Sequence, residues 1–264
     1  MAGIEANVRA AAGLRDFGGP MYTKAIHVDI GYCLSDDQAG FAFEPPKAVI
    51  EGRVKPMGMR AIQNCPAVNG IERQLVEIYA PIGLRLGLGN QGGQLGLKVN
   101  PQGTFAKQEV LQKMLVVEPP DRWRAPKKPV LQINLPFFFV TDEPCWCTIL
   151  PPFLSPNLRR WPGTMVAGRY PVGDWPQDLQ WGFEWDAVDQ ELVIRQGDVI
   201  AYAMFQFDHP DKRPRMVEAE ITEDLAEYRA GMDGVAQISP EIEEIWARAR
   251  DRRPAQLLNP VDAS

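Results

Sequence analysis

Apolar and polar residues alternate through the middle of this 264-residue chain. Between residues 123 and 207, short apolar segments are separated by Pro, Gly or Asp. They read LQINLPFFFV, CWCTILPPFL, TMVAGRY, LQWGFEW and ELVIRQGDVIAYAMFQF. A period of two is typical of strands that bury one face, and the turn residues favour antiparallel neighbours. The pattern predicts a mainly β fold, an antiparallel β-sandwich of the jelly-roll kind.

The same alternation predicts which side chains face the interior. Trp181, Phe183 and Trp185 share one face of their strand, so Glu184 and Asp186 are expected on the opposite face, in solvent. Burial of each large aromatic side chain should contribute roughly 2–3 kcal/mol. The predicted core consists of Phe137, Phe139, Trp146, Ile149, Trp181, Phe183, Trp185, Val193, Ile200, Tyr202 and Phe205.

Weaker strand patterns precede this region. YTKAIHVDIGYCL predicts one long strand or a pair, and AVIEGRV predicts a short strand. In NCPAVNGIERQLVEIYAPIGLRLGL, the residues Leu75, Ile78 and Ile82 predict an extended segment that passes into a second strand at residues 84–88. GNQGGQ predicts a hairpin tip before the returning strand GQLGLKV, because Gly adopts positive φ at little cost. TFAKQEVLQKMLVV fits a helix or the approach to a strand.

The chain becomes charged and helix-favouring after Phe207. Thr222 is expected to cap one helix, in TEDLAEYRAGM. Ser239 should cap a second, with Pro240 at its first helical position. That second helix has an apolar stripe that must dock on the sandwich or on another subunit, made of Ile242, Ile245, Trp246 and Ala249.

These patterns divide the chain into three parts. Residues 1–20 form an N-terminal extension, residues 21–208 the β-sandwich domain, and residues 209–264 a C-terminal helical extension.

Charge and cysteine content restrict the function classes. The net charge is −6, and the Lys and Arg residues are scattered, which argues against nucleic acid as a partner. No apolar window is long enough to span a bilayer, and the N-terminus lacks the apolar core of a secretory signal. Four Cys residues are too few for a disulfide scaffold, so we expect a reducing, cytoplasmic location.

One pattern suggests a metal. His27 and Asp29 form the H-x-D pair that iron- and 2-oxoglutarate-dependent oxygenases use, and residues two apart on a strand point the same way. His209 would complete a facial triad for Fe(II), and Arg213 or Arg215 would pair with the carboxylate of 2-oxoglutarate. The structural alternative is one histidine on a strand and one on an exposed loop.

Two further patterns have a structural and a functional interpretation. Cys145 and Cys147 share one face of a strand, where two small core residues are expected rather than metal ligands. Trp161 and Trp175 fall in loops, and exposed tryptophans along a groove would indicate a carbohydrate-binding or carbohydrate-cleaving sandwich. The Gly-rich segment at residues 83–99 lacks the G-K-[ST] ending of a phosphate loop.

Three segments carry a family resemblance. Asn64-Cys65-Pro66-Ala67 is followed by EIYAPIGLRL, and GRYPVGDWPQDLQWGFEW is followed by LVIRQGDVIAYAMFQF, with an I-x-x-G-D hairpin. The third segment is RRPAQLL. Together they resemble an uncharacterised group of proteins from tailed bacteriophages and some bacteria. The resemblance implies a β-rich fold and phage association, but no activity. Members often have Arg two residues after the Trp, where this chain has Gln177, so that residue's role does not carry over.

The sequence therefore assigns no catalytic residue. Its leading interpretation is a non-enzymatic binding or assembly protein, phage-encoded or phage-derived, without a cofactor. It would act as a homo-oligomer or with virion or assembly proteins through its C-terminal helix, in the cytoplasm or on the virion. The alternatives are the Fe(II) and 2-oxoglutarate oxygenase and the carbohydrate-directed sandwich.

Overall fold

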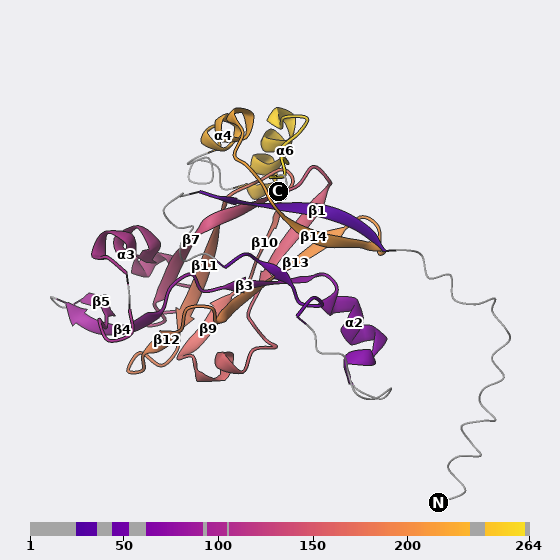
Figure 1. Cartoon of the computed structure of the whole chain (residues 1–264). Helices are drawn as coiled ribbons and strands as arrows, with labels where there is room; N and C mark the ends of the chain where they lie inside the picture. The colour runs from indigo at the N-terminus through magenta and orange to yellow at the C-terminus, as the bar shows by residue number, and fades with distance from the viewer. Residues whose placement is uncertain are drawn as a thin grey trace, which may run out of the picture.

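The strands of the molecule form three sheets, which the helices flank (Figure 1). The structure is a computed structural model that describes residues 25–35, 44–52, 62–91, 94–104, 106–232 and 241–261. The prediction of a mainly β, sandwich-like fold is confirmed.

Sheet A has the strand order β14-β1-β7-β11-β9, with β6 on β7. Its strands are antiparallel except for β1 and β14, which pair in parallel with Ile26 opposite Lys212. Strand β14 follows residue 208, so β structure continues into the part predicted to be a helical extension. The bounds are β1 (Ile26–Leu34), β6 (Leu115–Val117), β7 (Val130–Val140), β9 (Gly163–Val166), β11 (Asp178–Trp185) and β14 (Lys212–Glu218).

Sheets B and C are antiparallel throughout their described pairs. Sheet B has the order β10-β8-β13-β3-β2, with β2 (Lys47–Ala48), β3 (Leu75–Tyr79), β8 (Cys145–Leu150), β10 (Gly168–Pro171) and β13 (Val199–Phe207). Sheet C has the order β12-β4-β5, with β4 (Leu84–Gln91), β5 (Gln94–Val99) and β12 (Leu192–Ile194). The predicted glycine-rich hairpin is confirmed as β4 and β5.

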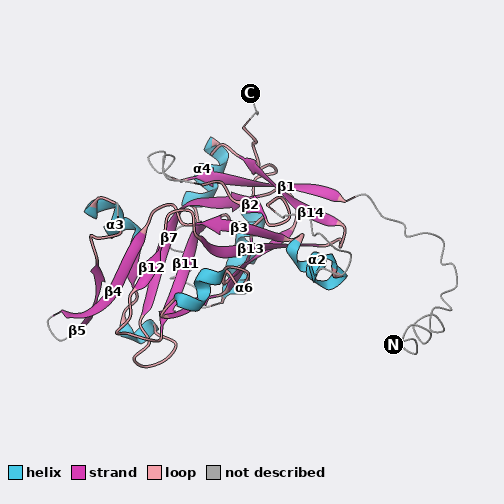
Figure 2. Cartoon of the chain, turned by 60° about the horizontal axis from the view of Figure 1, so that its bottom comes forward, coloured by secondary structure: helices cyan, strands magenta, loops and turns pink. Residues whose placement is uncertain are grey.

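Short helices stand at the two ends of the sheets, α3 (Gln108–Met114) at one end and α2 (Pro66–Glu72) at the other (Figure 2). The extended segment expected around Leu75 and Ile78 is confirmed as β3. Helix α2, which precedes it, was not predicted; Pro66 occupies its first turn, where no backbone donor is needed. The segment with two interpretations forms both elements, α3 and then β6. Short 3₁₀ turns lie at Ile62–Asn64, Pro120–Arg122 and Pro156–Arg160. No described helix is long and apolar enough to cross a bilayer.

One apolar core joins side chains of all three sheets. The predicted core residues are buried except Trp146 and Val193, for which the prediction was wrong. Leu192 and Ile194 take the inner face of β12, which leaves Val193 48% exposed. Cys145 and Cys147 likewise take the inner face of β8, so Trp146 lies on its outer face. Both cysteines are buried core residues, as expected.

The prediction for Glu184 was also wrong, although Asp186 is exposed as expected. Glu184 is only 5% exposed, and Arg124 Nε donates to its carboxylate over 3.1 Å. Lys128 Nζ lies 3.8 Å from Glu184 and donates to Asp186 over 2.7 Å. Burial of this carboxylate is compensated by two cations whose side chains reach solvent.

Helices α4 (Glu223–Ala230) and α6 (Ile242–Arg252) form a second layer, which lies above sheet A in Figure 1. Thr222 caps α4 as predicted, since its Oγ1 accepts a hydrogen bond from Leu225 N over 3.3 Å. Ser239 and Pro240 lie outside the described residues, and α6 itself begins at Ile242. A second apolar cluster packs this layer on sheet A and comprises Cys33, Phe138, Val140, Ala219, Leu225, Tyr228, Met232, Ala249, Leu257 and Leu258.

Candidate functional site

The predicted metal ligands are not brought together. Asp29 binds Arg215 through both carboxylate oxygens, the Nη2 contact being 2.8 Å. His27 is exposed on β1, and the backbone N–H of Asp211 donates to His209 Nδ1 in the turn before β14. No three His, Cys, Asp or Glu side chains in the described part of the chain gather as possible metal ligands. Arg215, one of the two arginines expected to hold 2-oxoglutarate, instead pairs with the expected metal ligand Asp29.

The two loop tryptophans have different surroundings. Trp161 is 8% exposed and packs edge-on against Trp181, with the ring centroids 5.5 Å apart. It therefore belongs to the apolar core and lines no open groove. Trp175 is half-buried in the loop between β10 and β11, and it lines two cavities.

The loop that carries Trp175 is held by side chains of the helical layer. The Tyr228 hydroxyl donates to Asp174 O over 2.7 Å, and Arg229 Nε donates to Pro176 O over 3.1 Å. Arg250 Nε binds the Asp174 carboxylate over 2.9 Å, while Arg253 Nε donates to Gly173 O over 2.7 Å. These contacts fix the backbone on both sides of Trp175, and its side chain packs against the apolar cluster under the helical layer.

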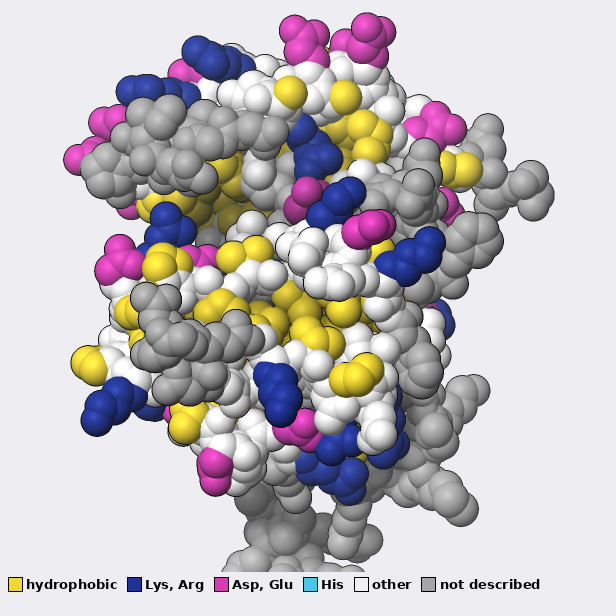
Figure 3. Space-filling view, turned by 90° about the vertical axis from the view of Figure 1, so that its left-hand side faces the viewer, with side chains coloured by type: hydrophobic (Ala, Val, Ile, Leu, Met, Phe, Trp, Pro, Cys, Tyr) yellow, Lys and Arg dark blue, Asp and Glu magenta, His cyan; other side chains and the backbone are white. Residues whose placement is uncertain are grey.

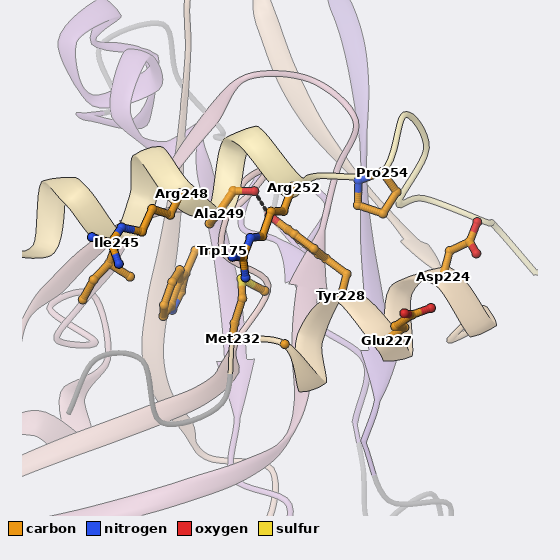
Figure 4. Close-up of a pocket in the computed structure, with 11 residues that line it drawn as sticks. Trp175, Asp224, Glu227, Tyr228, Met232, Ile245, Arg248, Ala249, Arg252 and Pro254 are labelled. Carbon is orange, nitrogen blue, oxygen red and sulfur yellow. Dashed lines mark hydrogen bonds between the residues drawn. The ribbon is translucent and has the colours of Figure 1, made fainter. Parts of the chain in front are cut away.

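The first cavity, which we call the helix cavity, has a volume of about 540 Å³ between α4 and α6. In Figure 4, α6 passes over Trp175 with Ile245 and Ala249, and Met232 and Tyr228 approach from the other side. Ala249 O lies 2.8 Å from the same Tyr228 hydroxyl and shares its single proton with Asp174 O, which ties α4 to α6. The remaining lining residues are Asp224, Glu227, Gly231, Arg248, Arg252 and Pro254.

The second cavity, the strand cavity, has a volume of about 550 Å³ at the corner where β9 leads into β10. Its walls include Trp175 and two side chains from the first turns of α6, Ile242 and Trp246. Arg169 and Gln177 supply polar groups to it, and Tyr170 also lines it. The other lining residues are Gln132, Ile149, Val166, Ala167, Gly168, Asp178, Leu179, Gln180 and Gly182.

A third hollow of about 660 Å³ lies on the other side of Arg169. Its charged side chains are largely paired across the hollow, with Arg253 3.4 Å from Asp142 and Arg250 on Asp174. Figure 3 shows a face of the molecule on which hydrophobic side chains gather in hollows with charged side chains around them. Trp146 and Phe207 give this third hollow aromatic walls as well, so what sets the other two apart is that they share Trp175.

Burial governs the titration of the phenols and thiols near these cavities. It raises the pKa of Tyr228 to about 12, and the Asp174 carboxylate adds to this shift. It also raises the pKa of Tyr170 well above its usual value, with Cys147 as the next cause. Burial raises the pKa of the Cys145 thiol to about 12. These groups are neutral near pH 7, and no buried thiolate nucleophile arises here.

Sequence reasoning identified Trp175 but missed most of the other lining residues. Trp146 was assigned to the core, yet its ring meets Trp246 edge-on with centroids 5.2 Å apart. The alternation of Cys145, Trp146 and Cys147 could have predicted this position. Only one face of the strand can point inward, so two buried cysteines place Trp146 on the outer face. Nothing in the sequence marked Arg169.

Comparisons with known protein families, with curated proteins and with solved structures gave no match to this chain.

Proposed function

We propose that this chain is a non-enzymatic binding or assembly protein, phage-encoded or phage-derived, that holds a segment of a partner protein against Trp175. The observation that carries the proposal is the position of Trp175, which lines both the helix cavity and the strand cavity, of about 540 and 550 Å³. Ligand sites commonly enclose roughly 300–1,000 Å³ and combine apolar walls with a few polar groups.

A protein segment fits this arrangement better than a small substrate does. The two cavities lie on either side of one tryptophan, so an extended partner can place an apolar side chain in each. Tryptophan in a fixed setting is the residue type that most often dominates binding energy at such contacts.

The apolar stripe of α6 is largely used within the chain. Ile245 and Ala249 are buried, and Trp246 packs on Trp146. Ile242 remains 47% exposed at the rim of the strand cavity. The partner, whether a second copy or a virion or assembly protein, would therefore meet α6 at its first turn.

The two alternatives receive less support. The oxygenase requires His27, Asp29 and His209 around one ion, and Asp29 is engaged by Arg215. The carbohydrate site requires a groove that exposes both loop tryptophans, and Trp161 is in the core.

A selection of random peptides on the immobilised full chain tests the proposal. We expect the wild-type protein to enrich peptides with a shared apolar residue. Trp175→Ala should weaken the binding of the selected peptides about 30-fold, because truncation of a central tryptophan costs about 2 kcal/mol. Circular dichroism checks that the variant is folded.

Two more variants separate a loss of binding from a loss of folding in Trp175→Ala. Ile242→Ser changes an exposed residue at the strand cavity and should weaken the same peptides several-fold. Val193→Ser makes a similar change at an equally exposed residue on β12 and should leave binding unchanged. Selected peptides that bind all four proteins equally, or a selection that enriches no sequence, would overturn the proposal.

A further inference from the structure

The strand cavity has an uncompensated positive charge. Among the described residues that line it, the charged side chains are Arg169 and Asp178. Asp178 is neutralised by Arg229, whose Nη2 lies 2.8 Å from the Asp178 carboxylate. Arg169 makes no ion pair with any carboxylate of the described chain segments. The cavity therefore presents one guanidinium whose charge is available to a ligand.

This guanidinium is held in position by aromatic packing. Its central carbon lies 4.5 Å from the centroid of the Trp146 ring, and Trp146 is in turn held by Trp246. Stacking uses the face of the planar guanidinium, while its N–H groups point outward along the edge. Arg169 can therefore keep its stack on Trp146 and donate hydrogen bonds to a bound anion at the same time.

One further group in the same cavity lacks a partner. The Gln177 side-chain nitrogen is a buried atom without a hydrogen-bond partner in the described part of the protein. Buried polar atoms of this kind are rare in folded proteins, because each one costs desolvation energy. This nitrogen can donate hydrogen bonds, so it favours a ligand group rich in acceptors.

We propose that the strand cavity is a carboxylate-binding subsite, in which Arg169 binds an acidic side chain or a C-terminal carboxylate of the segment that packs on Trp175. This inference rests on the proposed function for the identity of the ligand, and on Arg169 and the unpartnered Gln177 amide for its chemistry. A planar guanidinium matches a carboxylate in shape and in charge. A phosphate brings nearly twice the charge, and a single cation would leave part of it unpaired.

Binding of small aromatic acids to the full chain tests the subsite directly. Benzoate, benzamide and phenyl phosphate share a ring for the aromatic walls and differ in the polar group. We expect benzoate to bind about tenfold more tightly than benzamide, measured by ligand-observed NMR titration, because charged hydrogen bonds exceed neutral ones by about this factor. Arg169→Gln should remove the difference between benzoate and benzamide.

Two control variants make the result specific to Arg169. Arg169→Lys keeps the charge but not the planar fork, so it should restore only part of the preference for benzoate. Arg195→Gln removes the same charge from an exposed residue at a different cavity and should change nothing.

Equal binding of benzoate and benzamide, or a preference for benzoate that survives Arg169→Gln, would refute the subsite. Phenyl phosphate that binds more tightly than benzoate through Arg169 would also overturn it, in favour of a phosphate ligand. These results leave the peptide selection on Trp175 unaffected, so failure of the subsite and failure of the proposed function are separate outcomes.

Discussion

The two faces of β7 are covered in different ways. The inner face places Leu131, Ile133, Leu135, Phe137 and Phe139 in the apolar core. The outer face places Phe138 and Val140 under the helical layer, where Arg229 stacks on the Phe138 ring at 3.6 Å. Farther along the same outer face, Gln132 lines the strand cavity.

The difference teaches that the two faces of β7 are stabilised differently, one by apolar burial alone and the other by apolar burial together with hydrogen bonds in the layer that covers it. The inner face depends on apolar burial, which is proportional to area and needs no particular partner. The outer face combines a second apolar cluster with directed hydrogen bonds, from Tyr228, Arg229 and Arg253 to backbone carbonyls, that hold the helical layer and the loops beside it. Removal of an inner side chain should therefore destabilise the whole protein, while removal of an outer contact should loosen one layer.

The largest effect is expected for Trp181→Ala. Trp181 is 1% exposed, stacks on Phe183 with centroids 5.3 Å apart, and donates a hydrogen bond to Ile200 O over 2.8 Å. Its truncation should lower the free energy of unfolding by about 3–5 kcal/mol. Urea denaturation followed by far-UV circular dichroism measures this value. A loss under about 1 kcal/mol would show that the inner face does not dominate stability.

A smaller, local effect is expected for Arg253→Ala. Arg253 donates to Gly173 O and, over 3.1 Å, to Thr141 O, so its loss leaves buried carbonyls without partners. We expect a loss of about 2 kcal/mol that is confined to α6 and the Trp175 loop. Hydrogen exchange should show faster exchange in α6 and unchanged protection in β11.

Arg248→Ala is the matched control for this variant. Arg248 is exposed and pairs with Glu244 one turn away over 3.5 Å, so its removal should change stability by less than about 0.5 kcal/mol. Equal loss of protection in α6 and β11 of Arg253→Ala would mean that the two layers unfold as one unit.

The smallest effect is expected for Tyr228→Phe, and it depends on pH. At neutral pH the loss of the phenolic proton that two carbonyls share should cost about 1 kcal/mol. Burial raises the pKa of Tyr228 from 10.0 to about 12, so the phenol must stay neutral in the folded protein. Its contribution is complete below pH 10 and is lost as the pH rises through 12.

Urea denaturation at pH 7, 10 and 11 tests this dependence. The stability of wild type should fall more steeply above pH 10 than that of Tyr228→Phe, so the difference between the two proteins should shrink. Cys33, whose pKa burial raises to about 12, contributes the same slope to both proteins. Parallel curves for the two proteins would contradict the role of Tyr228.

The sequence predicted the inner layer well because alternation is a local signal. A period of two placed Trp181, Phe183 and Trp185 inward without knowledge of their neighbours. One error arose at Val193, which lies in a strand of three apolar residues. Such a short apolar run does not show which residues face inward. Glu184 was misplaced because its cations, Arg124 and Lys128, lie about 60 residues away in the chain.

The candidate site was much less predictable. Trp175 stood out as a loop aromatic, but its contacts come from residues that are distant in sequence. Asp174 meets Tyr228 across 54 positions, and Thr141 meets Arg253 across 112. The segment RRPAQLL attracted notice through its family resemblance, and in the structure its Arg253, Leu257 and Leu258 attach the helical layer to sheet A. No periodicity within one segment can reveal such pairings.

The parallel pairing of β1 with β14 has a consequence for biosynthesis. Asp29 and Arg215, which face each other across this pair, are 186 residues apart. During translation β1 leaves the ribosome long before either of its neighbours in sheet A has been made. Contacts of such separation close slowly, because a long loop must first be ordered. The newly made chain therefore has an incomplete sheet for most of its synthesis, a period in which chaperones have the most time to act.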